Sequence, residues 1–356
     1  MKAAVCRAFH ADLELEELTL AAPGPGEIEV QVEACAICHS DLSYVDGYWG
    51  GALPLVLGHE AVGRVASLGP GVSGFALGER VLVTLIWACG TCPACAQAAP
   101  TSCHHTWDPM DSPLRSAAGE VVSHGMHTGA FAERTVVDAS QCVAVPGDMD
   151  PAALSLLSCG VITGWGAVAN TAKLQAGQSC AVIGAGGVGL NAIQAAAARG
   201  AKHIIAVDVS DDKCAAAKAF GATHALRAGP DLADQVRALT GHGLDFAFVT
   251  VGAPPAFRQA PALLAPGGAV VLVGMPASET EIGYDPLTLA SLNQSILGSR
   301  MGQTVLSRDI PPLIEAYRAG RLKLDALVTG RYPLDRINEA MAEVRAGRAL
   351  RNVIVF

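Results

Sequence analysis

The sequence predicts a two-domain α/β protein, in which a partly open β-barrel-like domain is joined to a doubly wound parallel sheet. Three observations predict this fold class. The chain has 356 residues, more than a single hydrophobic core usually serves. Up to about residue 140, short alternating apolar patterns are broken by Pro and Gly. From about residue 150, β-like and helix-like segments alternate, as a parallel sheet with crossover helices requires.

Half-buried strands are predicted in the first part of the chain, because apolar and polar residues alternate there. The alternation covers residues 27–34, 58–66 and 80–85. At the far end, helical spacing at 310–319 and 334–346 precedes a strand at 351–356. We expect this tail to return to the first domain. Residues 1–160 and 299–356 would then form one discontinuous domain, and residues 161–298 the other.

The second part of the chain predicts the repeating units of a doubly wound sheet. The expected elements are a strand at 179–183, a glycine turn, a helix at 190–199, a strand at 202–209, helices at 211–220 and 232–240, a strand at 246–251, a helix at 256–264 and a strand at 269–273. A strand at 269–273 or at 296–298 is expected at the sheet edge. There it can pair across a two-fold axis, which favours a homodimer or homotetramer.

The glycine turn is Gly184-Ala185-Gly186-Gly187-Val188-Gly189, placed between the first of these strands and its helix. A G-x-G-x-x-G sequence alone is a weak signal in a chain with 39 glycines. Here Asp208 follows the next strand, 19 residues after Gly189, where a carboxylate can accept hydrogen bonds from an adenosine ribose. The context favours a dinucleotide site over a tight strand–helix turn, with the pyrophosphate at the helix start.

The composition argues against several functional classes. The net charge is −9 and no Lys/Arg-rich run occurs, which disfavours nucleic acid and anionic membranes as partners. Lys2 and Arg7 interrupt what would be the apolar core of a signal peptide, and no apolar run reaches about 18 residues. We therefore expect a soluble, cytoplasmic protein. In such a chain, eleven cysteines favour metal binding or catalysis over disulfides.

Four cysteines form a C-x2-C-x2-C-x7-C cluster at Cys89, Cys92, Cys95 and Cys103. Four thiolates complete a tetrahedral shell with no open position, which is typical of a structural zinc site. An iron–sulfur cluster is the first alternative, but its motif usually continues with x3 and a Pro, whereas His104 follows here. Unliganded thiols are the second alternative.

Further Cys and His residues are scattered in three motifs. They are Cys38-His39-Ser40-Asp41, Gly58-His59-Glu60-Ala61-Val62-Gly63 and Cys159-Gly160-Val161. Each alone is typical of a buried core. Together with the cysteine cluster, the glycine turn and Asp208, they make the chain resemble the zinc-dependent alcohol dehydrogenases of the medium-chain dehydrogenase/reductase superfamily. The resemblance extends over nearly the whole chain. It implies a GroES-like catalytic domain and a Rossmann domain.

The resemblance implies a second, catalytic zinc ion held by Cys38, His59 and Cys159, with a fourth position open to water or a substrate oxygen. Two zinc ions per chain are therefore expected. Asp41 resembles the carboxylate that orients the ligand histidine, and Glu60 resembles the acid beside the metal in this family. Two thiolates and a neutral imidazole would balance the charge of the ion.

Other site residues are also implied by the resemblance. Ser40 corresponds to the hydroxyl that takes the proton from the alcohol, and a turn serine is the alternative. The family often has a histidine three residues later, and Ser43 replaces it here, so the usual proton path is incomplete. His39 and Arg351 correspond to residues near the cofactor pyrophosphate. Ordinary surface charge is the alternative for both.

NAD is expected in preference to NADP, by at least about tenfold in kcat/KM. The Asp208 carboxylate would repel a ribose 2′-phosphate, and no arginine directly follows it. Residues 209–212 add two more carboxylates. Lys213 resembles a lysine that contacts the adenosine ribose in relatives. Val188 and Val273 are expected behind the nicotinamide ring, or else are plain sheet core.

The substrate pocket is less well specified by the sequence. An apolar, partly aromatic lining is expected from Tyr48, Trp49, Leu85, Ile86 and Trp87, unless these side chains only pack. The segment 104–127 contains His104, His105, His124 and His127. We expect a solvated loop there, rather than part of the active-site cleft that the resemblance implies between the two domains.

The function implied is hydride transfer between an alcohol and NAD, which interconverts the alcohol and an aldehyde or ketone. An enzyme working mainly as an aldehyde or ketone reductase, or as a dehydrogenase of thiol adducts, is an alternative in the same family. Cys159 argues against polyol dehydrogenases, which usually carry an acid at that position. A non-catalytic nucleotide-binding protein is the remaining alternative, and the intact ligand and relay residues argue against it.

Overall fold

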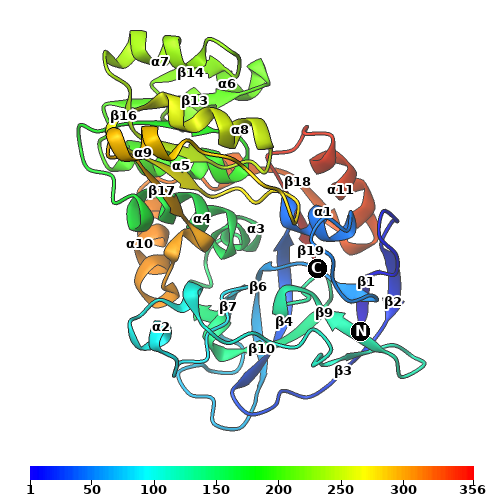
Figure 1. Ribbon diagram of the computed structural model, residues 1–356. Coiled ribbons are helices and arrows are strands. Elements are labelled where there is room, and N and C mark those ends of the chain that lie inside the picture. The colour runs from blue at the N-terminus through cyan, green and yellow to red at the C-terminus, as the bar shows by residue number, and fades with distance from the viewer. The chain divides into compact units, whose positions relative to one another are not determined.

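The computed structural model describes residues 1–356 and consists of two compact units (Figure 1). The first unit contains Met1–Cys159, Val305–Glu315 and Lys323–Phe356. The second contains Gly160–Thr304 and Ala316–Leu322. Both chain termini therefore belong to the first unit. Most of the C-terminal tail also joins this unit.

Two mixed sheets build the first unit, and all their strand pairs are antiparallel except β5–β9 and β18–β19. The first sheet has the order β2-β1-β5-β9-β8-β3 and the second β11-β7-β6-β4-β19-β18, with β10 also paired to β4. The strands are β1 (Lys2–Cys6), β2 (Glu14–Glu17), β3 (Thr19–Leu20), β4 (Glu27–Ala36), β5 (Leu55–Val56), β6 (Glu60–Leu68), β7 (Arg80–Thr84), β8 (Leu114–Arg115), β9 (Val121–His124), β10 (Arg134–Asp138), β11 (Cys142–Ala144), β18 (Val328–Pro333) and β19 (Arg351–Val355).

Strand β4 shows why the alternating pattern predicted the strands correctly. Ile28, Val30 and Val32 are buried in the core of the unit, while Gln31 between them is exposed. Strands β4, β6 and β7 confirm the predicted strands. The C-terminal strand β19 pairs antiparallel with β4, with Ile354 opposite Cys35. This pairing places the end of the chain beside the region that carries the first metal-ligand motif.

Short helices connect these strands. They are α1 (His39–Val45), α2 (Pro93–Ala96), α3 (Pro151–Ser155) and α11 (Ile337–Arg345), while α10 (Leu306–Arg318) is divided between the two units. Helix α3 begins at a Pro, which is favoured at the first helical position. The Asp150 carboxylate caps it by accepting a hydrogen bond from the Ala152 N–H at 3.3 Å.

The second unit is a doubly wound parallel sheet with the strand order β14-β13-β12-β15-β16-β17. All five strand pairs are parallel. The strands are β12 (Ser179–Ile183), β13 (His203–Asp208), β14 (His224–Arg227), β15 (Leu244–Val249), β16 (Leu264–Leu272) and β17 (Ser295–Gly298). The helices are α4 (Gly160–Gly166), α5 (Gly187–Ala198), α6 (Asp211–Ala217), α7 (Leu232–Thr240), α8 (Pro254–Gln259) and α9 (Pro286–Ser291).

The elements predicted for this unit are confirmed, but the sequence did not predict α4, α9 or β14. The short strand β14 was not expected from the sequence, because its half-buried residues show no clear alternation. The alternative of an edge strand at residues 269–273 is wrong. These residues belong largely to β16, which lies between β15 and β17, so β17 forms the edge. Its residues Ser295–Gly298 contain the other predicted edge segment.

No single helix is both long enough and apolar enough to cross a membrane. One bent helix pair, Pro151–Ser158 followed by Gly160–Thr171, is long and apolar enough to cross a membrane, by length and composition only.

Candidate active site

Four metal-binding side chains converge in the first unit. Cys38 stands just before α1, His59 and Glu60 stand at the start of β6, and Cys159 follows a short 3-10 turn. Ala36 at the end of β4 is paired with Glu60, which brings the loop of Cys38 to the start of β6. The potential ligand atoms of the four residues all lie within 4.8 Å of one another. The scattered motifs of the sequence thus form one buried cluster.

Asp41 holds this cluster together. Its carboxylate is fully buried and accepts hydrogen bonds from the Cys38 N–H at 2.9 Å and from the Gly58 N–H at 3.1 Å. The same carboxylate lies 3.2 Å from Nδ1 of His59. A carboxylate at this distance favours a proton on Nδ1 and leaves Nε2 free to act as a ligand. One side chain therefore positions both loops and sets the histidine tautomer.

The His59 ring provides a direct test of whether a metal ion fits. Its Nε2 atom is buried and has no hydrogen-bond partner. A buried nitrogen without a partner costs about 1–3 kcal/mol. This nitrogen lies among two thiols and a carboxylate, and thiolate sulfur and imidazole nitrogen are the ligands that zinc prefers. The residues present therefore fit a zinc ion, which would satisfy the nitrogen.

The pKa values of the two thiols in the cluster are shifted in opposite directions. The hydrogen bond from Cys159 holds the pKa of Cys38 well below its ordinary value, and His59 contributes in the same direction. The same hydrogen bond, together with burial, raises the pKa of Cys159. One thiolate is thus already favoured, and binding a cation would release the second proton.

Glu60 forms a buried ion pair with Arg351 on β19, although 291 residues separate them in sequence. Both carboxylate oxygens accept from the guanidinium. Burial raises the pKa of Glu60 to about 8, and the positive charge of Arg351 opposes this rise. Arg351 is 4% exposed, so the surface-charge alternative is wrong for this residue. The predicted pyrophosphate contact of Arg351 stays a prediction.

The proposed proton relay starts beside this cluster. Ser40 lies in the first turn of α1, with its Oγ 3.7 Å from Sγ of Cys38. Ser43 is half-buried on the same helix, at the position where the family often has a histidine. His39, the first residue of α1, is exposed, and its predicted role near the pyrophosphate stays a prediction.

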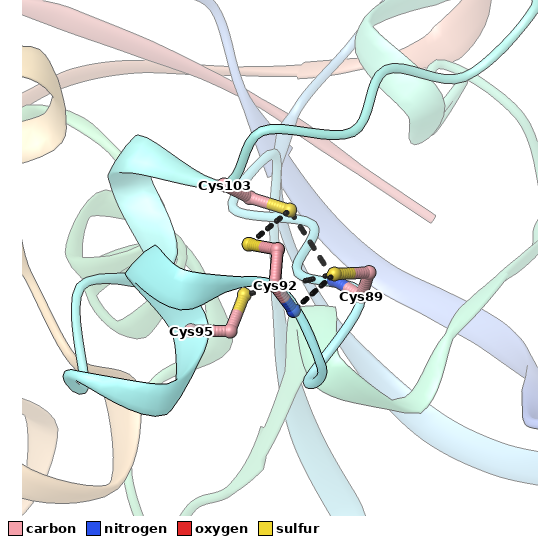
Figure 2. A group of neighbouring side chains, drawn as sticks. All are labelled: Cys89, Cys92, Cys95 and Cys103. Atoms are coloured by element: carbon pink, nitrogen blue, oxygen red, sulfur yellow. Dashed lines mark hydrogen bonds between the residues drawn. The ribbon is translucent and has the colours of Figure 1, made fainter.

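The second group of metal ligands is the four-cysteine cluster. Figure 2 shows the side chains of Cys89, Cys92, Cys95 and Cys103 turned toward one another around α2. Sγ of Cys89 lies 3.9 Å from Sγ of Cys95, and the Cys92–Cys103 pair has the same distance. These separations are too long for disulfides, and all four thiols are free. All four sulfur atoms lie within 4.8 Å of one another, as ligands of one ion require.

Backbone N–H groups surround these sulfur atoms. The Cys92 N–H points to Sγ of Cys89 at 3.4 Å, and the His104 N–H points to Sγ of Cys92 at 3.5 Å. The N–H groups of Thr91 and Cys92 lower the pKa of Cys89 to about 5. Stabilising the thiolate prepares the sulfur for a cation. Burial raises the pKa of Cys95 to about 12, so the fit to the structural zinc ion predicted from the spacing rests on the geometry of the four sulfur atoms.

The glycine turn lies in the second unit, between β12 and α5. Gly184 has φ +104°, which other residues rarely adopt, and a Cβ on Gly189 would meet the Gly184 carbonyl at 1.8 Å. At Gly186 a Cβ would meet nothing within 4 Å, so open space lies there before the start of α5. No side chain caps α5. The backbone thus fits a pyrophosphate, which the free N–H groups at the start of this helix can receive.

Asp208 ends β13 beside the glycine turn. Its two carboxylate oxygens accept hydrogen bonds from the Ala185 N–H at 2.8 Å and the Ser210 N–H at 3.0 Å. The carboxylate is therefore fixed in place and retains lone pairs for ribose hydroxyls. Lys213 lies in the first turn of α6, and its ribose contact stays a prediction.

Sequence reasoning missed Thr250, whose Oγ1 donates to the carbonyl of Gly184 at 2.8 Å and so supports the glycine turn. A hydroxyl residue just after a strand carries no local signal for such a role. Val188 is the second residue of α5 and Val273 follows β16, where its N–H donates to the Val249 carbonyl at 3.0 Å. Both valines are half-buried, and their contacts with a nicotinamide ring stay predictions.

The residues predicted to line a substrate pocket pack against aromatic or apolar neighbours. Trp49 meets Tyr44 edge-on with ring centroids 5.4 Å apart, and Trp87 meets His127 edge-on at 5.9 Å. Leu85 packs against the core of the first unit. Trp49, Leu85 and Trp87 are partly exposed, so they remain accessible to an apolar ligand. Of the other two predicted residues, Tyr48 is 55% exposed and Ile86 is buried.

The prediction of a solvated loop with four histidines is wrong for two of them. His104 and His105 are exposed, but His124 lies at the end of β9 and is 2% exposed. Its Nε2 atom lies 2.7 Å from the carbonyl of Thr128. His127 is half-buried against Trp107, with ring centroids 5.4 Å apart. Burial lowers the pKa of both His124 and His127, and that of His124 falls to about 3.

Comparisons with known proteins agree with this geometry. Residues 24–147 match the family model of the alcohol dehydrogenase GroES-like domain, and residues 187–319 match that of the zinc-binding dehydrogenases. The chain is 33% identical to geraniol dehydrogenase from Castellaniella defragrans, with coverage of 100% of this chain and 97% of that protein.

Two solved structures are similar over the whole chain. One is an alcohol dehydrogenase zinc-binding domain protein from Burkholderia ambifaria, with a TM-score of 0.95, 35% identity, and coverage of 100% of this chain and 98% of that one. The other is benzyl alcohol dehydrogenase from Acinetobacter calcoaceticus, with a TM-score of 0.94, 32% identity, and coverage of 100% and 99%.

Proposed function

This chain belongs to the zinc-dependent alcohol dehydrogenases of the medium-chain dehydrogenase/reductase superfamily, and on that premise we propose that it oxidises apolar or aromatic alcohols with NAD. The observation that carries the proposal is the buried cluster of Cys38, His59, Glu60 and Cys159. Its ligand atoms lie within 4.8 Å of one another, and Nε2 of His59 has no other partner. The reaction is reversible, so the same site can reduce aldehydes or ketones.

When bound, zinc supplies Lewis acidity toward the alcohol oxygen and the nicotinamide cofactor supplies the hydride acceptor. The protein residues supply position and proton transfer. Cys38, His59 and Cys159 would hold the metal, and Asp41 fixes the imidazole through Nδ1. Glu60 would stay beside the metal, because Arg351 holds its carboxylate.

Ser40 is the proposed acceptor of the alcohol proton. Its Oγ lies 3.7 Å from Sγ of Cys38, so it reaches the ligand cluster from the first turn of α1. A hydroxyl can accept one proton while it donates its own, which suits a relay. Because Ser43 replaces the histidine common in relatives, the onward path to bulk solvent runs through water.

NAD is proposed as the cofactor and NADP is disfavoured. Asp208 is fixed by two backbone N–H groups and points a negative charge where a 2′-phosphate would bind. Discrimination of about tenfold in kcat/KM requires about 1.4 kcal/mol, which one nearby carboxylate can supply. Equal kcat/KM values for the two cofactors would refute the role of Asp208.

The preference for apolar or aromatic alcohols rests on the side chains of Trp49, Leu85 and Trp87. They are partly exposed and lie in the same unit as the metal-ligand cluster. Two similar proteins are named for geraniol and for benzyl alcohol, which are both apolar alcohols. The second ion of the proposed two zinc ions per chain would be structural, in the four-cysteine cluster.

A homodimer or homotetramer is also proposed. Strand β17 ends the parallel sheet and presents unpaired backbone groups, and its Ile296 and Leu297 are only half-buried. Such an edge is usually covered. Sedimentation analysis of the purified protein tests this, and a monomer at micromolar concentration would contradict it.

The function is tested by following NADH formation with a series of primary, secondary and aromatic alcohols. We expect turnover of apolar or aromatic alcohols, and Ser40→Ala should lower kcat by about 10²–10⁴-fold, as loss of acid–base catalysis does. Ser43→Ala on the same helix is the matched control and should stay within about twofold of the wild type. The proposal fails if the zinc-loaded protein turns over no alcohol and no aldehyde.

A further inference from the structure

Strand β14 places an arginine beside Asp208 that the sequence pattern does not reveal. Asp208 and Arg227 are the last residues of adjacent parallel strands and are paired in register. Adjacent strands lie about 4.8 Å apart, and residues in register project from the same face of the sheet. The two ends are tied together, because the Ala228 N–H donates to the Asp208 carbonyl at 2.9 Å.

The Arg227 side chain is paired with a second carboxylate, that of Asp211. Its Nη1 donates to Oδ2 of Asp211 at 2.8 Å, and the two side chains are 65% and 74% exposed. An exposed ion pair of this kind contributes little stability, about 0–1 kcal/mol, so the guanidinium can leave it for a stronger anion. A phosphate dianion is such a partner, because a guanidinium can bind it through two parallel hydrogen bonds.

The position at the carboxyl ends of β13 and β14 belongs to the ribose side of the cofactor site. Ligands of doubly wound sheets bind at the carboxyl ends of the strands, and Asp208 marks the ribose there. A 2′-phosphate on this ribose would lie close to Asp208, Asp211 and Arg227 together. The two carboxylates repel it and the guanidinium attracts it.

We propose that Arg227 is a latent ligand for the 2′-phosphate of NADP, which Asp208 masks by repulsion and Asp211 masks by pairing. This inference rests on the proposed binding of NAD at the glycine turn. The specificity of the site is then set by two carboxylates acting in different ways. Removing either one exposes a cation that the fold already places beside the ribose.

The test compares dissociation constants for NAD and NADP, measured by calorimetry on the zinc-loaded protein. Asp208→Ser should tighten NADP binding by about tenfold or more, and Asp211→Asn should tighten it by a smaller factor. Adding Arg227→Ala to Asp208→Ser should remove most of this gain. The gain should also shrink as salt is raised, since an exposed charge pair is screened.

Arg237→Ala is the matched control, because Arg237 forms a similar exposed pair with Asp234 on α7 of the same unit. Combined with Asp208→Ser, it should leave the gain intact. A gain that survives Arg227→Ala, or no gain in Asp208→Ser, would overturn the inference while NAD binding continues to support the proposed function. A wild-type protein that binds neither cofactor would overturn both.

Discussion

Replacing Asp41 by Asn is expected to weaken the catalytic zinc site without unfolding the protein. The side chain keeps its shape but loses its charge and one of its two acceptor oxygens. In the structure these oxygens accept from the N–H groups of Cys38 and Gly58 and face Nδ1 of His59. In one orientation of the amide, its NH2 group faces the Cys38 N–H. In the other, it faces the Gly58 N–H and Nδ1 of His59, so one hydrogen bond is lost either way.

The magnitude follows from these contacts. A buried hydrogen bond to a charged group contributes about 1.5–3 kcal/mol, and one such bond is lost. Loss of an outer partner of a ligand histidine typically weakens metal binding by about 10–100-fold, or about 1.4–2.8 kcal/mol. The two estimates agree. We therefore expect the zinc dissociation constant of this site to rise by about 10–100-fold in Asp41→Asn.

The assay is equilibrium competition with a zinc chelator, with the zinc bound per chain counted at each chelator concentration. The variant should release one ion at about 10–100-fold lower free chelator, while the other ion stays bound. Asp46→Asn is the control, because Asp46 ends the same helix but pairs with Arg345 away from the ligands. Release curves that coincide for the wild type and Asp41→Asn would refute the role assigned to this carboxylate.

Three further predictions follow from other parts of the chain. Cys92→Ser should lower the zinc content from two ions to one by removing a ligand of the structural site, and metal analysis showing two ions would contradict it. His124 should contribute a fall of about 2 kcal/mol in the unfolding free energy between about pH 8 and about pH 5, because burial depresses its pKa from 6.5 to about 3 and only the unfolded chain takes up the proton in that window. Urea titrations of His124→Gln should show a smaller fall, and an equal fall would exclude this residue. Ser43→His should raise turnover at low pH, where proton release limits it, and an unchanged pH–rate profile would reject that idea.

The sequence predicted the features that depend on neighbouring residues. The glycine turn, the strands β4, β6 and β7 and the four-cysteine cluster are each encoded within about 30 residues, so spacing and periodicity are sufficient to identify them. The ligand set of Cys38, His59 and Cys159 is different, because three distant motifs had to be combined through the resemblance. The structure then brought them together with Glu60.

The remaining features depend on pairings that periodicity does not encode. Arg351 meets Glu60 because β19 and β6 flank β4 in one sheet, although nothing near either residue indicates the other. Arg227 lies opposite Asp208 only through the register of β13 and β14. His124 was predicted to be solvated because a long connection usually runs over the surface, but β9 pairs with β5 and buries it.

The most direct test of the account is a crystallographic measurement of anomalous scattering at the zinc absorption edge. We expect two peaks per chain. One should lie among Cys38, His59 and Cys159, and the other among the four cysteines of the cluster in Figure 2. A single peak at the four-cysteine cluster, from zinc-loaded protein, would contradict the proposed active site.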